Sequence, residues 1–218
     1  MNAKYFGLVS FETAQLLQTQ KWSEIKSGIS PEFVLGMEIE PTVTLGARSA
    51  GGDVFWLEES WRERGFKVAK ADRGGQATIH NPGQLVIFPT LDIRNLGVRR
   101  FVCLLSEVTR KFLAAYGCET KWREEDPGLY TSRGKVMSVG LRVRCGIATH
   151  GLSINVHNDL TPFQGIRVCG RAGAAVDRLR TEEPLSELFS RWTEELTAQL
   201  TTPAFSRNLG SDNRVMRL

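Results

Sequence analysis

Three stretches of the chain space hydrophobic and polar residues at the three- to four-residue steps of an amphipathic helix. They cover residues 11–26, 98–115 and 184–200. In the last stretch, leucines and aromatic residues recur so regularly that they form one apolar stripe. Thr181 and the two glutamates and proline after it form a helix start signal. The pattern therefore predicts three helices, each with one buried face.

Shorter runs rich in Val, Ile and Thr lie between these helices and have the composition of strands. They are residues 33–45, 66–71, 84–89, 136–143 and 151–156. Helices and strands follow one another without a regular strand–helix–strand period. This order favours an α+β fold with a mainly antiparallel or mixed sheet. The length of 218 residues suits one domain over residues 1–218, with residues 203–218 as a polar, loosely ordered tail.

The composition is that of an ordinary globular protein, with 41% hydrophobic and 24% charged residues. The net charge of +4 is small and the basic residues are scattered, which argues against a nucleic-acid site. No run approaches the roughly 18 apolar residues of a membrane-spanning helix. The N-terminus does not resemble a secretory signal. We therefore expect a cytoplasmic protein that does not bind membranes.

The four cysteines show neither a CxxC pair nor zinc-like spacing, so we expect free thiols and no metal site. Cys103, Cys118 and Cys145 have the surroundings of packing positions. Cys169 precedes a glycine, which allows a sharp turn that exposes its thiol. Cys169 is therefore the best candidate nucleophile, although an isolated cysteine is more often a small buried hydrophobic residue.

Residues 73–84, RGGQATIHNPGQ, form the first candidate site segment. Its Gly-Gly pair lets backbone N–H groups approach a ligand closely. Arg73 adds a fixed cation and His80 a group that both donates and accepts. The same residues are also common in turns and hairpins, so a purely structural role is open.

Lys135 opens the predicted strand of the second candidate segment, which runs from residue 128 to residue 140. A lysine at a strand end usually keeps its amine in water. In a cleft, by contrast, loss of hydration would make the amine usable in proton transfer. A third segment, residues 149–155, carries His150, Gly151 and Ser153, and Cys169 follows it.

Together the three segments resemble the octanoyl-[acyl-carrier-protein]–protein N-octanoyltransferases of lipoate biosynthesis. The family pattern RGG-x-x-T-x-H-x-PGQ matches residues 73–84, and its G-[VL]-Y turn matches residues 128–130. Its lysine-led strand, its HG-x-x-x-N block and its Cys-Gly pair follow in the same order, ending at Gly170. Three positions depart from the pattern: Gln76 replaces an acidic residue, Asn81 a glycine and Val168 a proline.

The resemblance implies the mixed sheet flanked by helices of the biotin and lipoate protein ligases. It implies a catalytic pair in which Cys169 is the nucleophile and Lys135 its acid–base partner. It also implies a substrate pocket lined by Arg73, Gly74, Gly75, Gln76, His80, Ser138, Val139, Gly140, His150, Gly151 and Leu152.

The implied reaction moves an octanoyl group from octanoyl-acyl carrier protein to a lysine of a lipoyl domain, through a thioester on Cys169. The acceptors would be 2-oxoacid dehydrogenase subunits and the glycine cleavage H protein. We expect a monomer that needs no cofactor, because the thioester donor is already activated. Two alternatives are an ATP-dependent lipoate or octanoate ligase of the same fold and a catalytically silent acyl-binding protein.

Overall fold

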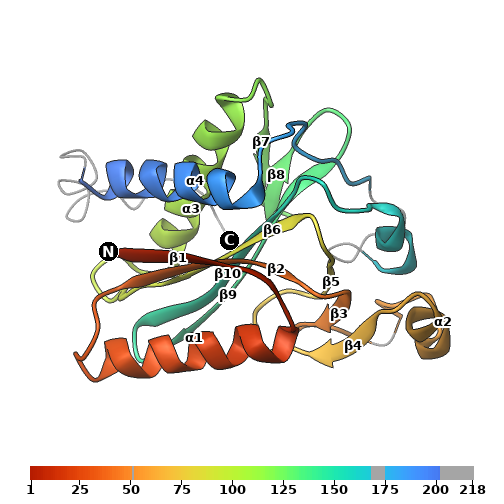
Figure 1. The fold of residues 1–218 in the computed structure, drawn as a ribbon, viewed down its shortest axis with the longest axis horizontal. Helices are drawn as coiled ribbons and strands as arrows, with labels where there is room; N and C mark the ends of the chain where they lie inside the picture. Colours follow the sequence, from red (N-terminus) through yellow and green to blue (C-terminus); the bar gives the residue numbers. More distant parts are fainter. Residues whose placement is uncertain (51, 168–174, 202–218) are drawn as a thin grey trace.

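A seven-stranded sheet forms the centre of the computed structural model, which describes residues 1–50, 52–167 and 175–201. Its strand order is β1-β2-β6-β10-β9-β8-β7 (Figure 1). The strands are β1 (Asn2–Val9), β2 (Phe33–Ile39), β6 (Gln84–Thr90), β7 (Lys121–Arg123), β8 (Gly128–Tyr130), β9 (Lys135–Arg144) and β10 (Ile147–Asn155). β1 and β2 are parallel, and the other neighbours are antiparallel. The sheet is therefore mixed, as predicted.

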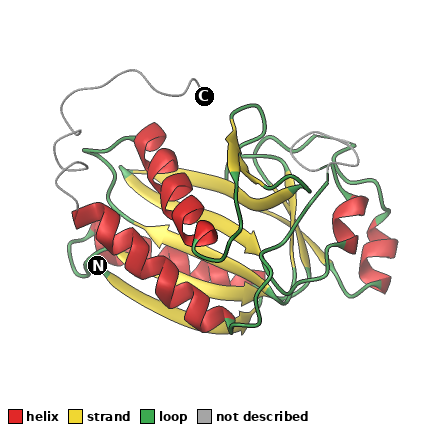
Figure 2. Cartoon of the chain, turned by 90° about the horizontal axis from the view of Figure 1, so that it is seen from above, coloured by secondary structure: helices red, strands yellow, loops and turns green. Residues whose placement is uncertain are grey.

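Helices cover both faces of this sheet (Figure 2). α3 (Val98–Ala114) and α4 (Leu185–Thr201) pack on one face, and α1 (Phe11–Lys26) packs on the other. All seven residues of β6 are buried, because its side chains point alternately into the two hydrophobic layers. This explains why the strand reads as a continuous apolar run in the sequence.

A smaller sheet of order β4-β3-β5 lies beside the first. It consists of β3 (Thr42–Leu45), β4 (Lys67–Lys70) and β5 (Ala77–His80), and it packs with α2 (Glu58–Glu63) and the 3₁₀ helix η1 (Thr161–Gly165). Trp61, which is fully buried, lies at the centre of this second core and packs edge-on against Phe66. The small sheet thus has a hydrophobic core of its own.

The three predicted helices are confirmed, with ends that differ by at most one residue. α1 has the predicted bounds because the Ser10 hydroxyl accepts a hydrogen bond from the Thr13 N–H and caps the first turn. The prediction of one strand over residues 33–45 is wrong. Pro41 separates β2 from β3, and the two strands join different sheets.

Several short or exposed elements escaped the pattern analysis. β1 is an edge strand with little buried surface, so it shows no clear hydrophobic alternation. β7 and β8 have three residues each, and β5 lies inside the segment that was interpreted as a site-forming loop. The predicted tail, residues 203–218, lies outside the described residues.

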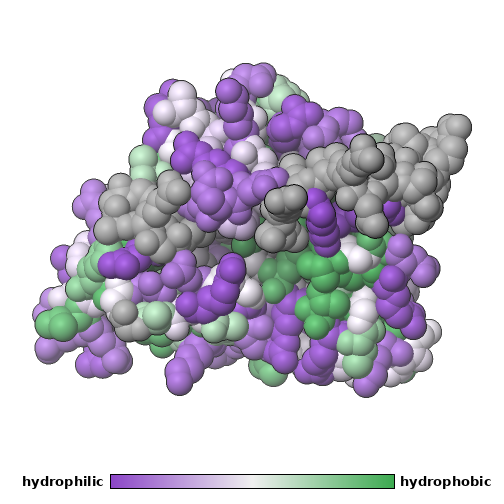
Figure 3. Space-filling model, turned by 180° about the vertical axis from the view of Figure 1, so that it is seen from behind, coloured by the Kyte–Doolittle hydropathy of each residue, from purple (hydrophilic) through white to green (hydrophobic). Residues whose placement is uncertain are grey.

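The surface is predominantly polar in the view of Figure 3, where hydrophobic residues gather only in smaller areas. Among the described residues, no helix combines the length and the hydropathy needed to cross a membrane.

Candidate active site

A pocket lies between the α1 face of the central sheet and the loop that precedes β5. It encloses about 600 Å³, including space open to solvent. Its walls are formed by Phe11, Arg73, Gly75, Gln76, Ala77, Thr78, His80, Phe88, Ser138, Val139, Gly140, His150, Gly151, Leu152 and Ser153. These residues come from five separate segments of the chain.

All of the sequence-predicted pocket residues except Gly74 line this one pocket. The Gly74 N–H instead donates to the Leu141 carbonyl at 2.9 Å, which attaches the loop to β9. Sequence reasoning missed five residues of the wall. Phe11 and Phe88 look like ordinary core residues in the sequence, whereas Ala77, Thr78 and Ser153 lie inside the candidate segments but were not selected as pocket residues.

The Arg73 side chain shapes the loop rather than presenting a free cation. Its Nη2 donates to the carbonyl and the hydroxyl of Thr44, at 3.0 and 2.7 Å. Its Nη1 donates to the carbonyls of Gly74 and Gln76, at 3.0 and 2.9 Å. The loop therefore wraps around the guanidinium, and Gly75 allows this with a φ of 87° that other residues rarely adopt.

Gly140 allows this loop to lie directly on β9. A Cβ at position 140 would lie 3.1 Å from Arg73 Cδ and 3.1 Å from the Gly74 carbonyl oxygen. These distances are shorter than ordinary van der Waals contacts, so a side chain would displace the loop. The glycine in the lysine-led strand therefore has a packing role.

His80 is held as a neutral ring of defined tautomer. Its Nδ1 lies 2.7 Å from Gln84 Oε1, and the Gln84 amide nitrogen is already committed to donating to Ile79 and Asn155. Gln84 Oε1 must therefore accept, so His80 Nδ1 carries the hydrogen and Nε2 is an acceptor. Burial, aided by the charge of Arg73, lowers the pKa of His80 to about 4.

His150 is also neutral near pH 7. Burial is the main cause that lowers its pKa to about 4, with contributions from Arg73 and Arg142. Its Nε2 lies 2.6 Å from Asp72 Oδ1, and Asp72 also forms an ion pair with Arg142. The backbone of His150 has a φ of 56°, an uncommon value for a non-glycine residue. Such strain inside a strand is found mainly at functional sites.

Lys135 is buried, contrary to the usual behaviour of a lysine at a strand end. Its side chain is 2% exposed, and its Nζ lies 2.7 Å from Oδ1 of Asp126, which is 3% exposed. Gly128 makes room for the lysine side chain, because a Cβ at position 128 would lie 2.4 Å from Lys135 Cε. The amine is therefore removed from water, as one of the two interpretations of the sequence required, although Lys135 is not among the residues of the pocket wall.

A β-bulge changes the direction of the residues at the start of β9. Tyr130 pairs with Lys135 and Leu129 pairs with Met137, so Val136 is an extra residue. In a regular strand, Lys135 and Met137 would point to the same face. The bulge shifts this alternation, so that Met137 joins the hydrophobic core while Lys135 reaches Asp126.

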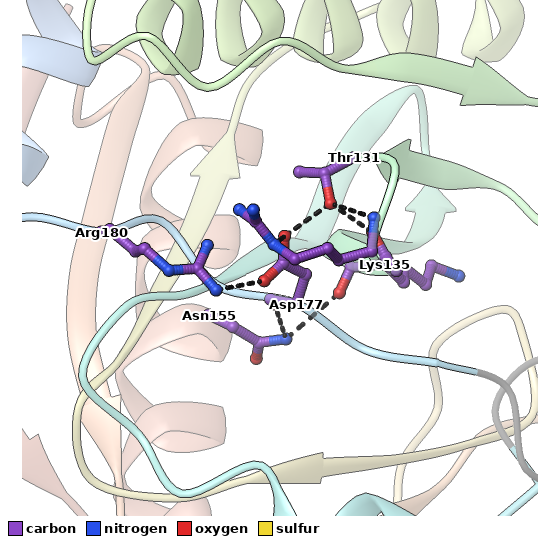
Figure 4. Close-up of polar contacts among 7 residues, drawn as sticks. Thr131, Lys135, Asn155, Asp177 and Arg180 are labelled. Carbon is purple, nitrogen blue, oxygen red and sulfur yellow. Dashed lines mark hydrogen bonds and ion pairs between the residues drawn. The ribbon is translucent and has the colours of Figure 1, made fainter.

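Ala175 and Asp177, which follow Cys169 by six and eight positions, are hydrogen-bonded to the backbone of Lys135. The Lys135 N–H donates to the Ala175 carbonyl and the Asp177 N–H donates to the Lys135 carbonyl, both at 2.9 Å. Asn155 Nδ2 donates to the Asp177 carbonyl at 3.1 Å. Figure 4 shows Asn155 in contact with both Asp177 and Lys135, with the Lys135 side chain extending away from Asp177.

The Asp177 carboxylate strengthens this attachment. It is buried and accepts hydrogen bonds from three side chains, those of Thr131, Arg133 and Arg180. Cys169 itself lies outside the described residues. The described chain resumes six residues later, at Ala175, directly on β9.

The three described cysteines differ in their surroundings. Cys103 and Cys118 are partly buried, and burial raises the pKa of both thiols. The expectation that Cys145 is a packing residue is wrong. Cys145 is exposed and forms the β9–β10 turn with Gly146, where both residues have the positive φ of a type I′ hairpin turn.

Two of the three departures from the family pattern are accommodated by polar contacts. Asn81 donates to the Asp159 carbonyl at 2.8 Å and accepts from Asn158 at 3.1 Å. Gln76 donates to Asp53 Oδ1 at 3.4 Å. Val168 lies outside the described residues. Within the described chain, no group of three His, Cys, Asp or Glu residues is placed to hold a metal ion.

Comparisons with known proteins identify the family. Residues 11–197 match the lipoyl protein ligase A/B catalytic domain. An octanoyltransferase from Laribacter hongkongensis is 35% identical over 208 residues, which cover 93% of this chain and 97% of that protein. One from Halorhodospira halophila is 49% identical over 181 residues, covering 82% and 80%.

The fold agrees with this assignment. A crystal structure of lipoate-protein ligase A bound with ATP superposes with a TM-score of 0.71, over 96% of this chain and 94% of that one, at 15% identity. The predicted fold class is therefore confirmed. The chain belongs to the lipoyl protein ligase A/B catalytic-domain family and, within it, to the octanoyltransferases.

Proposed function

We propose that the protein transfers an octanoyl group from octanoyl-acyl carrier protein to a lysine of a lipoyl domain through a thioester on Cys169. Lys135 acts as the acid–base group of both half-reactions. The observation that carries this proposal is the position of Lys135. Its amine is buried at the start of the strand that, from three positions further on, lines the pocket with Ser138, Val139 and Gly140.

The connection between Cys169 and Lys135 also supports the pair. Ala175, six residues after Cys169, accepts a hydrogen bond from the Lys135 N–H. A link of six residues spans up to about 20 Å when fully extended, so the chain length allows Cys169 and Lys135 to meet. Of the described cysteines, Cys103 and Cys118 are weaker candidates, because burial raises the pKa of both thiols and disfavours their thiolates.

In the first half-reaction, the Cys169 thiolate attacks the carbonyl carbon of the donor thioester. The bond to the carrier sulfur breaks, and the Lys135 ammonium gives its proton to that sulfur. In the second, the acceptor amine attacks the enzyme thioester, an amide forms, and the Cys169 thiolate leaves. The proton of the amine passes to Lys135, which restores the ammonium. Two steps with one nucleophile let two protein partners use the site in turn.

The pocket walls fit an acyl chain that carries no charge. The aromatic and aliphatic wall residues Phe11, Phe88 and Leu152 provide apolar surface. Both histidines in the wall are neutral near pH 7, and the Arg73 guanidinium is occupied by loop carbonyls. Backbone N–H groups near Gly140, His150 or Gly151 would stabilise the oxyanion, and one such donor is typically worth about 3–4 kcal/mol.

The test is a transfer assay with octanoyl-carrier protein and a lipoyl domain. We expect Cys169→Ser to abolish transfer and Lys135→Met to lower the rate by about 10²–10⁴-fold. Intact-mass spectrometry of the wild-type protein should detect an octanoyl adduct on Cys169 that hydroxylamine removes. Undiminished transfer by Cys169→Ser would contradict the thioester route.

The two alternatives predict different outcomes of the same assay. A ligase would use free octanoic acid and require ATP, whereas an acyl-binding protein would retain the ligand without turnover. A series of carrier-bound acyl chains of different lengths measures the chain preference. The cytoplasmic location, the monomeric state and the single domain stay predictions.

A further inference from the structure

The partner of the Lys135 amine carries a further inference, which rests on the proposed function. We infer that Asp126 is a positioning residue of the acyl transfer reaction. Its carboxylate holds the Lys135 amine in place and in the ammonium form that protonates the departing carrier sulfur. Asp126 belongs to none of the sequence-predicted site residues and does not line the acyl pocket.

The geometry of the pair fits a fixed ammonium donor. Lys135 Nζ lies 2.7 Å from Asp126 Oδ1, the distance of a charge-assisted hydrogen bond, and both side chains are almost completely buried. Ion pairs at a protein surface are mobile and contribute little to stability, whereas a buried pair is held by the packing around it. The amine therefore has a defined position before any substrate arrives.

The neighbouring residues hold both partners of the pair. The Tyr130 hydroxyl donates to the Asp126 carbonyl at 3.2 Å, which ties the turn before β8 to the end of that strand. The Tyr130 ring lies 5.5 Å from Lys135 Nζ, and the Arg123 guanidinium from β7 stacks on the same ring at 4.1 Å. Gly128 leaves the space that the lysine side chain occupies. Asp126 is thus the anion that these surroundings place beside the amine.

A buried ammonium without an anion is unfavourable. Removing one partner of a buried ion pair leaves the other charge uncompensated, and the protein then favours the neutral amine. A neutral amine cannot protonate the leaving sulfur. Loss of the carboxylate should therefore slow the chemical step without removing any contact to the acyl chain.

The first experiment compares Asp126→Asn with Glu125→Gln in the full-length protein. Glu125 is the exposed neighbour, so the control makes the same change of charge outside the pair. For Asp126→Asn we expect kcat to fall at least about tenfold, but by less than the loss of Lys135→Met. The KM for octanoyl-carrier protein should stay within twofold. The alkaline limb of the pH–rate profile should move to lower pH, because the amine loses its proton more readily.

A stability cycle tests the pair independently of catalysis. Thermal unfolding is measured for the wild type, Asp126→Asn, Lys135→Met and the double variant. We expect Asp126→Asn to have a lower melting temperature than the double variant, because only the single variant keeps the buried ammonium while removing the carboxylate beside it. Equal melting temperatures of Asp126→Asn and the wild type, with an unmoved pH–rate profile, would overturn the inference.

The outcomes separate this inference from the proposed function. If Cys169→Ser and Lys135→Met lose transfer while Asp126→Asn keeps the wild-type kcat and pH–rate profile, the positioning role alone fails. If Cys169→Ser and Lys135→Met keep full transfer, the proposed function fails, and the catalytic role of Asp126 fails with it. In that case the stability cycle still measures the ion pair as a structural element.

Discussion

His80 and His150 show how burial decides the chemistry of individual residues in the pocket. The sequence presents both as groups able to titrate near neutral pH. The tertiary structure surrounds them with protein and places Arg73 nearby, so the pKa of each falls to about 4. Both rings therefore act as neutral hydrogen-bonding groups at physiological pH, not as proton carriers.

This burial predicts a dependence of stability on pH. The unfolded chain binds protons on these histidines near their ordinary pKa of 6.5, whereas the folded chain binds them only near pH 4. The free energy of unfolding should fall as the pH decreases from about 6.5 to about 4, by up to about 3 kcal/mol per histidine. Urea unfolding across this range measures the effect.

The variant His80→Asn should flatten this dependence, because asparagine keeps a donor for Gln84 but does not titrate. The control His157→Asn changes an exposed histidine. In this variant the free energy of unfolding should depend on pH as it does in the wild type. Identical slopes for His80→Asn and the wild type would contradict the assigned state of His80.

At the scale of elements, helix α1 shows how a local sequence signal can position a pocket residue. Its first residue, Phe11, lines the pocket, and the Ser10 hydroxyl just before it caps the helix. β9 shows the opposite case. Its predicted strand was correct, but the bulge at Val136, which turns Lys135 toward Asp126, has no signal in the sequence.

The variant Ser10→Ala should lower the free energy of unfolding by about 1 kcal/mol, the usual cost of losing a capping side chain. Because fraying of the first turn would release Phe11, we also expect a higher KM for octanoyl-carrier protein. Ser10→Asp retains a capping oxygen and serves as the control. Chemical denaturation and transfer kinetics of both variants check the result. Equal KM values for Ser10→Ala and the wild type would show that the cap does not affect the shape of the pocket.

At the scale of the whole molecule, the two faces of the central sheet have different tasks. The face covered by α3 and α4 holds a large hydrophobic cluster, in which Trp192 is fully buried and donates to Thr109 Oγ1 at 2.9 Å. The opposite face, covered by α1, borders the pocket. Leu152 belongs to both this cluster and the pocket wall, so only changes away from the pocket, such as those at Trp192, should affect stability without altering substrate binding.

We expect Trp192→Phe to lower the free energy of unfolding by about 1 kcal/mol, because it keeps an aromatic ring but loses one hydrogen bond. Trp192→Ala should cost about 3–5 kcal/mol, because it leaves a cavity between the helices. The kcat and KM of Trp192→Phe, measured well below its melting temperature, should equal those of the wild type. An altered KM would show that the two faces are coupled.

The sequence by itself determined the elements whose signal is local. The three helices follow from apolar periodicity and from a capping residue such as Ser10, and both are properties of neighbouring positions. The pocket residues of the three segments were also found from the sequence, through the ordered resemblance to the octanoyltransferases. That resemblance rests on residue types at fixed spacings, which need no coordinates.

The tertiary structure alone decided what depends on contacts between distant segments. It divided residues 33–45 between two sheets, brought Phe88 into the pocket wall, and paired Lys135 with Asp126. Charge state and burial follow from what surrounds a side chain after folding, and a single residue carries no record of those surroundings. For this reason the sequence identified Lys135 as a candidate, but only the fold showed that its amine is buried beside a carboxylate.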